Sequence, residues 1–152
     1  LETWRIVNNV IAANADRGIQ LYPSAQDSVI ARNVIVGNGE GLIFSGAEGY
    51  ASSGNRVTHN VVTHSRTRFN IEYWWPDGNP IGTGNIADNN CVWGGAWGNL
   101  ALPEVGYSQR NNVTADPVYR NRSTGDFRPT SHSGCRQLLL GVALPLLKVS
   151  PS

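Results

Sequence analysis

Charged side chains with catalytic potential gather in residues 64–77. Arg68 is followed by Glu72 and then by Asp77, and His64 lies shortly before them. Elimination on an acidic polysaccharide needs a cation that neutralises a uronate carboxylate and a base that removes the neighbouring proton. Arginine or histidine can act as this base when its surroundings shift its pKa. Arg68, Glu72 and Asp77 are therefore the candidate catalytic residues of a polysaccharide lyase.

A structural interpretation of the same charges is also open. Arg17, Glu40 and Arg68 fall at similar points of successive sequence repeats, so they can pair as a ladder of modest stabilising effect. Hydrolysis is less favoured than elimination, because a glycosidase needs two carboxylates at a defined separation. Glu72 has only Ile43 and Ala101 as expected neighbours in its column.

Aromatic residues near these charges are candidate substrate-binding groups. Trp74 and Trp75 begin a polar, glycine-containing loop, and Tyr22 and Tyr50 lie in the equivalent loops of earlier repeats. Their flat faces can stack on sugar rings, and Arg17 is the cation expected to bind beside them. The alternative is that one or both tryptophans cover the end of the apolar core, since tryptophan is highly buried on average.

An internal repeat must position these residues. Its unit is aliphatic-x-x-Asn-x-aliphatic-x-x-Asn, and it becomes degenerate in the later copies. The copies comprise Ile6, Asn9, Ile11 and Asn14; Ile30, Asn33, Ile35 and Asn38; Val57, Asn60, Val62 and Ser65; Ala87, Asn90, Val92 and Gly95; and Gln109, Asn112, Thr114 and Pro117. The first Asn recurs after 24, 27, 30 and 22 residues, which suits one turn of a β-solenoid with loops of variable size.

A second short strand is expected after each unit, because apolar residues alternate there with a period of two. The alternating pairs are Ile19 and Leu21, Leu42 and Phe44, Ile71 and Tyr73, and Leu100 and Leu102. Asparagine suits the inward corners, because its amide offers a donor and an acceptor to backbone groups without partners. Leucine-rich repeats look similar, but Val and Ile outnumber Leu at the inward sites and no intervening segment has helical periodicity.

The motif resembles the parallel β-helix repeat of secreted bacterial proteins related in fold to pectate lyases, over about residues 4–117. Residues 115–119 and 125–129 resemble the closing segment of that group. The resemblance implies an all-β, right-handed parallel β-helix of about four to five rungs with an irregular C-terminal segment. It also implies that the Ile19-type strands border a sugar-binding groove. It does not decide the activity, since this scaffold carries lyases, hydrolases, epimerases and adhesive spikes.

Three regions are expected along the chain. Residues 1–117 form the rungs of an N-terminally truncated helix, residues 118–135 form the closing segment, and residues 136–152 form an atypical Leu-rich tail. Upstream rungs of a longer protein are an expected partner. We expect a polysaccharide partner and a secreted or cell-surface bacterial location, with a noncatalytic sugar-binding or adhesive stalk as the alternative to a lyase.

Composition limits the other partners. The net charge of +1 gives no reason to expect nucleic acid, and no apolar stretch approaches the roughly 20 residues of a membrane span. Cys91 and Cys135 are too few for a disulfide framework and can either pair or stay free. No metal site or cofactor is expected, although calcium stays open without a cluster of ligands to support it.

Overall fold

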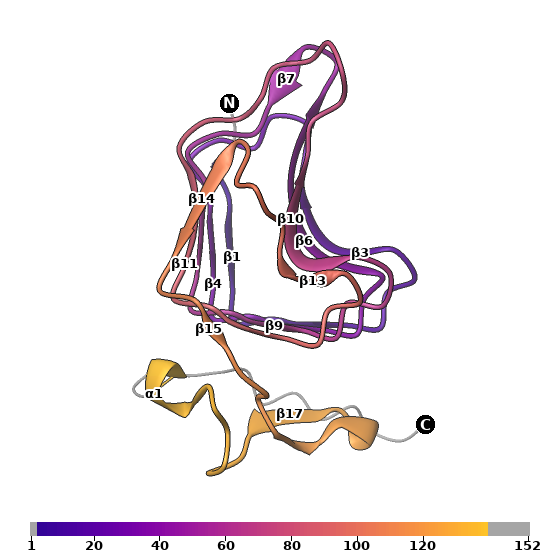
Figure 1. The fold of residues 1–152 in the computed structure, drawn as a ribbon, viewed down its shortest axis with the longest axis vertical. Coiled ribbons are helices and arrows are strands. Elements are labelled where there is room, and N and C mark those ends of the chain that lie inside the picture. The colour runs from indigo at the N-terminus through magenta and orange to yellow at the C-terminus, as the bar shows by residue number, and fades with distance from the viewer. Residues whose placement is uncertain (1–2, 140–152) are drawn as a thin grey trace.

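A computed structural model describes residues 3–139, which form an all-β solenoid of about four turns (Figure 1). Each turn contributes one strand to each of three parallel sheets. The flank sheet has the order β1 (Arg5–Val7), β4 (Val29–Ala31), β8 (Arg56–Thr58), β11 (Asn85–Asp88) and β14 (Tyr107–Arg110). The docking sheet contains β2 (Val10–Ala12), β5 (Val34–Val36), β9 (Val61–Thr63), β12 (Cys91–Trp93) and β15 (Val113–Thr114). The groove sheet contains β3 (Arg17–Leu21), β6 (Glu40–Ala47), β10 (Phe69–Trp74) and β13 (Gly98–Leu100).

The remaining elements lie outside the three parallel sheets. A short strand, β7 (Tyr50–Ala51), pairs antiparallel with β6. The C-terminal part contains the antiparallel pair β16 (Tyr119–Asn121) and β17 (Asp126–Pro129), the 3₁₀ helix η1 (Arg122–Thr124) and the helix α1 (Arg136–Leu139).

The register of the sheets confirms the repeat predicted from the sequence. In the flank sheet Ile6 pairs with Ile30, Ile30 with Val57, Val57 with Ala87, and Ala87 with Gln109. The aliphatic residues of the docking sheet and the Ile19-type residues of the groove sheet align in the same way. All three columns point inward, because a period of two sends alternate side chains into the core.

The anchor asparagines stack into a continuous ladder, as predicted. Asn33 accepts bonds at its Oδ1 from the backbone N–H and the amide of Asn9, at 3.0 and 3.1 Å. The pattern repeats from Asn33 to Asn60, from Asn60 to Asn90 and from Asn90 to Asn112. A further column at another corner, formed by Ser28, Asn55 and Asn85, was not predicted from the sequence.

The predicted inward orientation of one residue, Leu102, is wrong. Leu102 was expected to continue the alternation of the last rung, but it is 68% exposed, and β13 ends at Leu100. Proline follows Leu102 and has no N–H with which to continue a ladder. Tyr107 closes the core instead: it is 6% exposed, stacks on Phe44 with ring centroids 5.4 Å apart, and donates from its hydroxyl to the Ala101 carbonyl at 2.6 Å.

The closing segment packs on the outer face of the docking sheet (Figure 1). Phe127 and Tyr119 cover Val34 and Val36, and the Tyr119 hydroxyl lies 2.6 Å from the hydroxyl of Thr63. A disulfide joins Cys91 of β12 to Cys135 and resolves the pairing that the sequence left open. The boundaries at 117 and 135 stay a prediction, and residues 140–152 of the Leu-rich tail lie outside the described part of the chain.

His64 lies where the closing segment meets the solenoid. Its surroundings indicate that the stability of the fold depends on pH. Its Nδ1 is buried without a hydrogen-bond partner, and its ring lies 6.2 Å from that of Tyr119. Burial, and then the positive charge of Arg122, lower the pKa of His64, while Asp116 opposes them. The unfolded chain therefore binds a proton more readily than the folded one, so stability is complete above about pH 6.5 and falls as the pH drops below it.

We therefore expect a lower melting temperature at pH 5.5 than at pH 7.5, measured by circular dichroism. His64→Gln should reduce this difference, whereas His132→Gln should preserve it, because His132 is an exposed turn residue. An undiminished difference in His64→Gln would assign the pH dependence to another group.

Candidate functional site

The strands of the groove sheet bend, so its outer face is concave (Figure 1). A hollow of about 130 Å³ lies on this face. It is lined by Arg17, Gln20, Glu40, Ile43, Arg68, Glu72 and Trp74. The structure thus brings together four of the eight predicted site residues: Arg17, Arg68, Glu72 and Trp74. The repeat explains why, since β3, β6 and β10 pair in register and each rung adds a side chain to the same face.

Ion pairs run along this face from rung to rung. Arg17 donates to Asp16 at 3.2 Å and to Glu40 at 3.1 Å. The other Glu40 oxygen lies 3.7 Å from the Nε of Arg68. Arg68 in turn donates three hydrogen bonds of 2.7 to 3.1 Å to both oxygens of Glu72. The ladder of charges that the sequence offered as the structural alternative is therefore present.

Glu72 is the most buried member of this ladder, with 1% of its surface exposed. Burial raises the pKa of Glu72, because desolvation of the carboxylate outweighs its bonds to Arg68. The same bonds raise the pKa of Arg68, which keeps its guanidinium charged. A buried carboxylate held by two nitrogens of one arginine must break that pair before it can take a proton from a substrate.

Arg68 also lies against an aromatic ring that was not among the predicted site residues. The carbon at the centre of its guanidinium is 4.5 Å from the centroid of the Trp97 ring, a cation–π contact. Trp97 is 60% exposed and packs edge-on against Phe69, with ring centroids 6.0 Å apart. The alignment of Phe69 with Gly98 in the repeat could have placed the neighbouring Trp97 beside this face.

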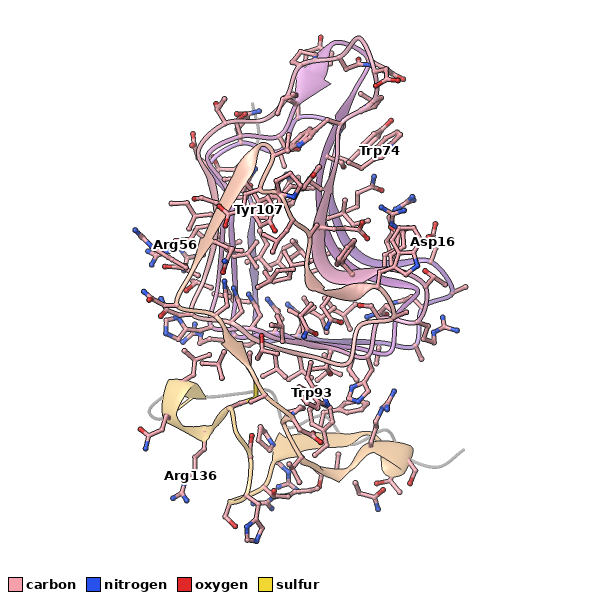
Figure 2. The ribbon with its side chains drawn as sticks, in the orientation of Figure 1. Asp16, Arg56, Trp74, Trp93, Tyr107 and Arg136 are labelled. Carbon is pink, nitrogen blue, oxygen red and sulfur yellow. A yellow bond between two sulfur atoms is a disulfide. The ribbon has the colours of Figure 1, made fainter. Side chains whose placement is uncertain are left out.

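The two adjacent tryptophans have different roles. Trp74 is 49% exposed and projects from the end of β10 on the concave side (Figure 2). Trp75 packs against the core, and its indole N–H donates to the Val105 carbonyl at 2.8 Å. Trp75 therefore agrees with the packing interpretation, although Trp74, Trp75 and Asp77 also line a separate hollow of about 370 Å³. Asp77 lies beyond both in an exposed turn and is not among the residues that line the hollow with Glu72.

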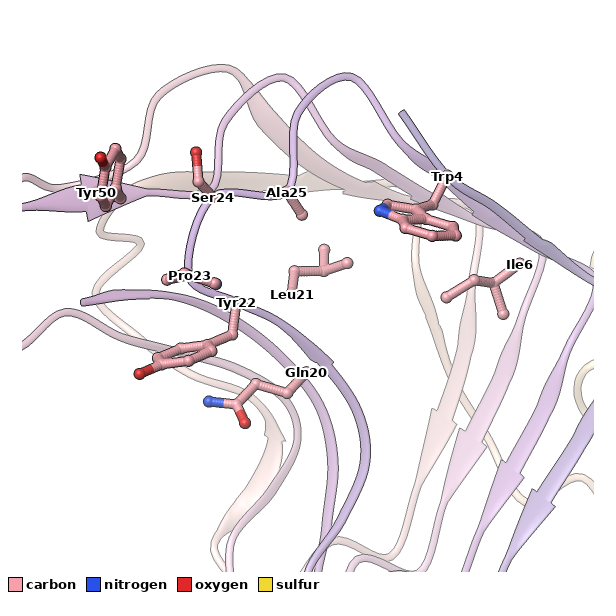
Figure 3. Close-up of a pocket in the computed structure, with 9 residues that line it drawn as sticks. All are labelled: Trp4, Ile6, Gln20, Leu21, Tyr22, Pro23, Ser24, Ala25 and Tyr50. Carbon is pink, nitrogen blue, oxygen red and sulfur yellow. The ribbon is translucent and has the colours of Figure 1, made fainter. Parts of the chain in front are cut away.

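Tyr22 and Tyr50 are exposed but line a different hollow, of about 600 Å³, at the N-terminal end of the solenoid (Figure 3). Trp4, Ile6 and Leu21 also line it, so it opens onto the apolar interior of the first rung. The structure does not place the two tyrosines in one site with Arg68 and Glu72. The prediction treated equivalent loops as neighbours, but Tyr50 and Tyr22 belong to the loops one and two rungs before that of Trp74, towards the N-terminal end of the solenoid.

Comparison with protein families identifies the chain. Residues 2–101, which include the groove sheet and the ladder of charges, match the family described as periplasmic copper-binding protein (NosD). The chain belongs to the NosD family. No curated protein and no solved structure matches it. The periplasmic description of NosD agrees with the secreted or cell-surface location expected from the sequence, and the disulfide is a bond that persists in oxidising compartments.

The described residues of this NosD-family chain do not fit a copper site. Within residues 3–139, no group of three or more His, Cys, Asp or Glu side chains is placed to hold a metal ion. Cys91 and Cys135 are consumed by the disulfide, and the sequence contains no Met, so the soft sulfur ligands that suit Cu(I) are missing. The Nδ1 of His59 is engaged with the Thr58 hydroxyl at 2.9 Å.

No helix in the described part of the chain has the length and hydropathy required to cross a membrane.

Proposed function

We propose that this NosD-family chain is a secreted, noncatalytic β-helix that binds a polysaccharide on the concave face of the groove sheet. The observation that carries the proposal is the combination of Trp74, half of whose surface is exposed, with a charged floor whose arginines are already held by carboxylates. An exposed indole offers a face for a sugar ring. A carboxylate that is already paired with an arginine is better suited to hydrogen bonding than to proton transfer.

The resemblance of the repeat to that of pectate lyases supports the outer face of the groove sheet as the binding surface. In the resemblance drawn from the sequence, the Ile19-type strands border the groove that binds sugar chains. The hollow with Arg17, Glu40 and Trp74 lies on the outer side of those strands.

Elimination on a polysaccharide is the second candidate. One observation favours it: Glu72, whose pKa is raised by burial, lines the hollow beside Arg68 and Trp74, where a base would be needed. Its bidentate pairing with Arg68 argues against it, because neither group is free to meet a substrate. Formation of the unsaturated product, followed by ultraviolet absorbance with uronate polymers, tests the lyase; any turnover lost in Glu72→Gln would overturn the noncatalytic proposal.

Trp74→Ala is expected to weaken polysaccharide binding about tenfold or more, because loss of a stacking face worth roughly 1.4 kcal/mol corresponds to a factor of ten. Affinity electrophoresis of the protein in gels that contain soluble polysaccharides measures this change in affinity. Trp93→Ala is the matched control, since Trp93 is also partly exposed but lies on the docking-sheet side (Figure 2). Equal binding by wild type and Trp74→Ala would remove this face from the proposal.

A further inference from the structure

The charges on the concave face do not add to a positive site. Two guanidinium groups, Arg17 and Arg68, are in contact with three carboxylates, those of Asp16, Glu40 and Glu72. The cluster therefore has one more anion than cation when all five are ionised. If Glu72 were neutral, the cluster would be balanced and still not positive.

A third arginine near this face, Arg66, is also engaged in hydrogen bonds. Arg66 donates from Nε to the Gly37 carbonyl at 2.9 Å and from Nη2 to the Asn14 carbonyl at 2.7 Å. These carbonyls belong to turns of preceding rungs, so the side chain lies along the turns. It is not among the residues that line the hollow.

Binding of a uronate here would be electrostatically unfavourable. Its carboxylate would lie beside Glu40 and Glu72 and would add a further negative charge to a cluster that already has one more anion than cation. Like charges brought together at a binding surface disfavour the complex and thereby provide discrimination.

A neutral sugar meets no such cost. Each hydroxyl can donate to a carboxylate and accept from a guanidinium, so it can bond to an intact ion pair. Glu40 and Arg17 are suited to this because both side chains keep part of their surface exposed and bond to each other at 3.1 Å. Gln20, whose amide donates to the Ser45 hydroxyl at 3.2 Å, adds an uncharged polar group to the same floor.

We propose that the groove selects neutral sugar units and rejects uronates. The inference rests on the proposed binding function and departs from the acidic polysaccharide expected from the sequence. Trp74 supplies the stacking face and the closed ladder of Arg17, Glu40, Arg68 and Glu72 supplies the polar floor.

The test compares polygalacturonate with its fully methyl-esterified form, which differ in charge but share a backbone, alongside neutral glucans, xylans and mannans. We expect binding to at least one neutral polymer, and at least tenfold weaker binding to the acidic polymers at low salt. Glu40→Gln removes one carboxylate and releases Arg17, so it should narrow this difference several-fold. Glu104→Gln, an exposed carboxylate outside the hollow, should leave the difference unchanged.

Two results overturn the inference in distinguishable ways. Tighter binding of the acidic polymers, lost in Trp74→Ala and weakened by salt, would reject neutral selectivity but keep the binding function. Absence of binding to every neutral and acidic polymer, by a chain shown to be folded, would reject the binding function and the selectivity with it.

Discussion

Asn60→Ala is expected to lower the free energy of unfolding by about 2–4 kcal/mol, because it leaves the buried N–H of Asn33 without its acceptor, at roughly 1–3 kcal/mol, and removes a second buried hydrogen bond worth roughly 1 kcal/mol. The Asn60 Oδ1 accepts the backbone N–H of Asn33 at 2.9 Å, and its amide donates to the Ile30 carbonyl at 2.9 Å. Asn33 and Ile30 are fully buried, so water cannot replace these bonds. Denaturant unfolding followed by circular dichroism measures the loss.

Asn9→Ala is the matched control for this prediction. Asn9 is the first member of the same ladder, and its amide makes the same kind of bond to Asn33, but the residue is exposed. Water can solvate what the substitution leaves behind, and we expect a loss below about 1 kcal/mol. Equal losses for the two variants would show that burial at the corner does not determine how much a ladder asparagine stabilises the fold.

The stacked part of the fold could be predicted from sequence because a solenoid repeats one local solution. Each rung needs an inward aliphatic pair and a corner amide, so Ile30 and Asn33 recur as Val57 and Asn60 with the same contacts above and below. Such a pattern is visible without knowledge of long-range contacts. The exceptions arise where this periodicity ends, as at Leu102, whose place in the core is taken by Tyr107 from the following turn.

The candidate site could be predicted only in part, for a related reason. Arg17 and Glu72 lie on paired strands and Arg68 directly precedes β10, so the register of the repeat brought them together. Loop residues have no such register. Tyr22 begins the loop after β3 and lines the hollow at the N-terminal end of the stack, while Trp75 turns inward to reach a carbonyl of the next rung.

The packing of the closing segment is likewise not encoded by the repeat. Its contacts with the docking sheet join single residues far apart in sequence, such as Cys91 and Cys135 at a separation of 44 residues. No periodicity predicts such a contact, and the number of cysteines left their pairing open. The outward positions of the docking sheet, at Val34 and Val61, do carry a signal, because apolar residues on both faces of a strand indicate that both faces are covered.

Arg68→Met is expected to cost about 2–3 kcal/mol of unfolding free energy at pH 7. Removal of one partner of a buried ion pair leaves an uncompensated charge worth roughly 3–5 kcal/mol, and we expect a cost below this range because Arg68 is about one third exposed and solvent screens the pair. The carboxylate left behind, that of Glu72, is 1% exposed. The cost therefore comes from the buried charge rather than from lost packing.

The pH dependence of Arg68→Met distinguishes these two causes. Burial already raises the pKa of Glu72, and loss of Arg68 removes the bonds that oppose this, so the pKa rises further above its unfolded value of about 4.3. The folded state then binds more protons than the unfolded state. Stability is accordingly gained as the pH falls through the folded pKa, and the deficit of Arg68→Met should shrink between pH 7 and pH 5.

The double variant Arg68→Met/Glu72→Gln allows a double-mutant cycle that isolates the interaction between the two side chains. With the carboxylate replaced by a neutral amide, most of the deficit at pH 7 should disappear, together with its pH dependence. If the double variant is as unstable as Arg68→Met at both pH values, the guanidinium stabilises the rung through its contact with Trp97 at 4.5 Å. The ladder of charges would then be a consequence of the fold rather than a contributor to its stability.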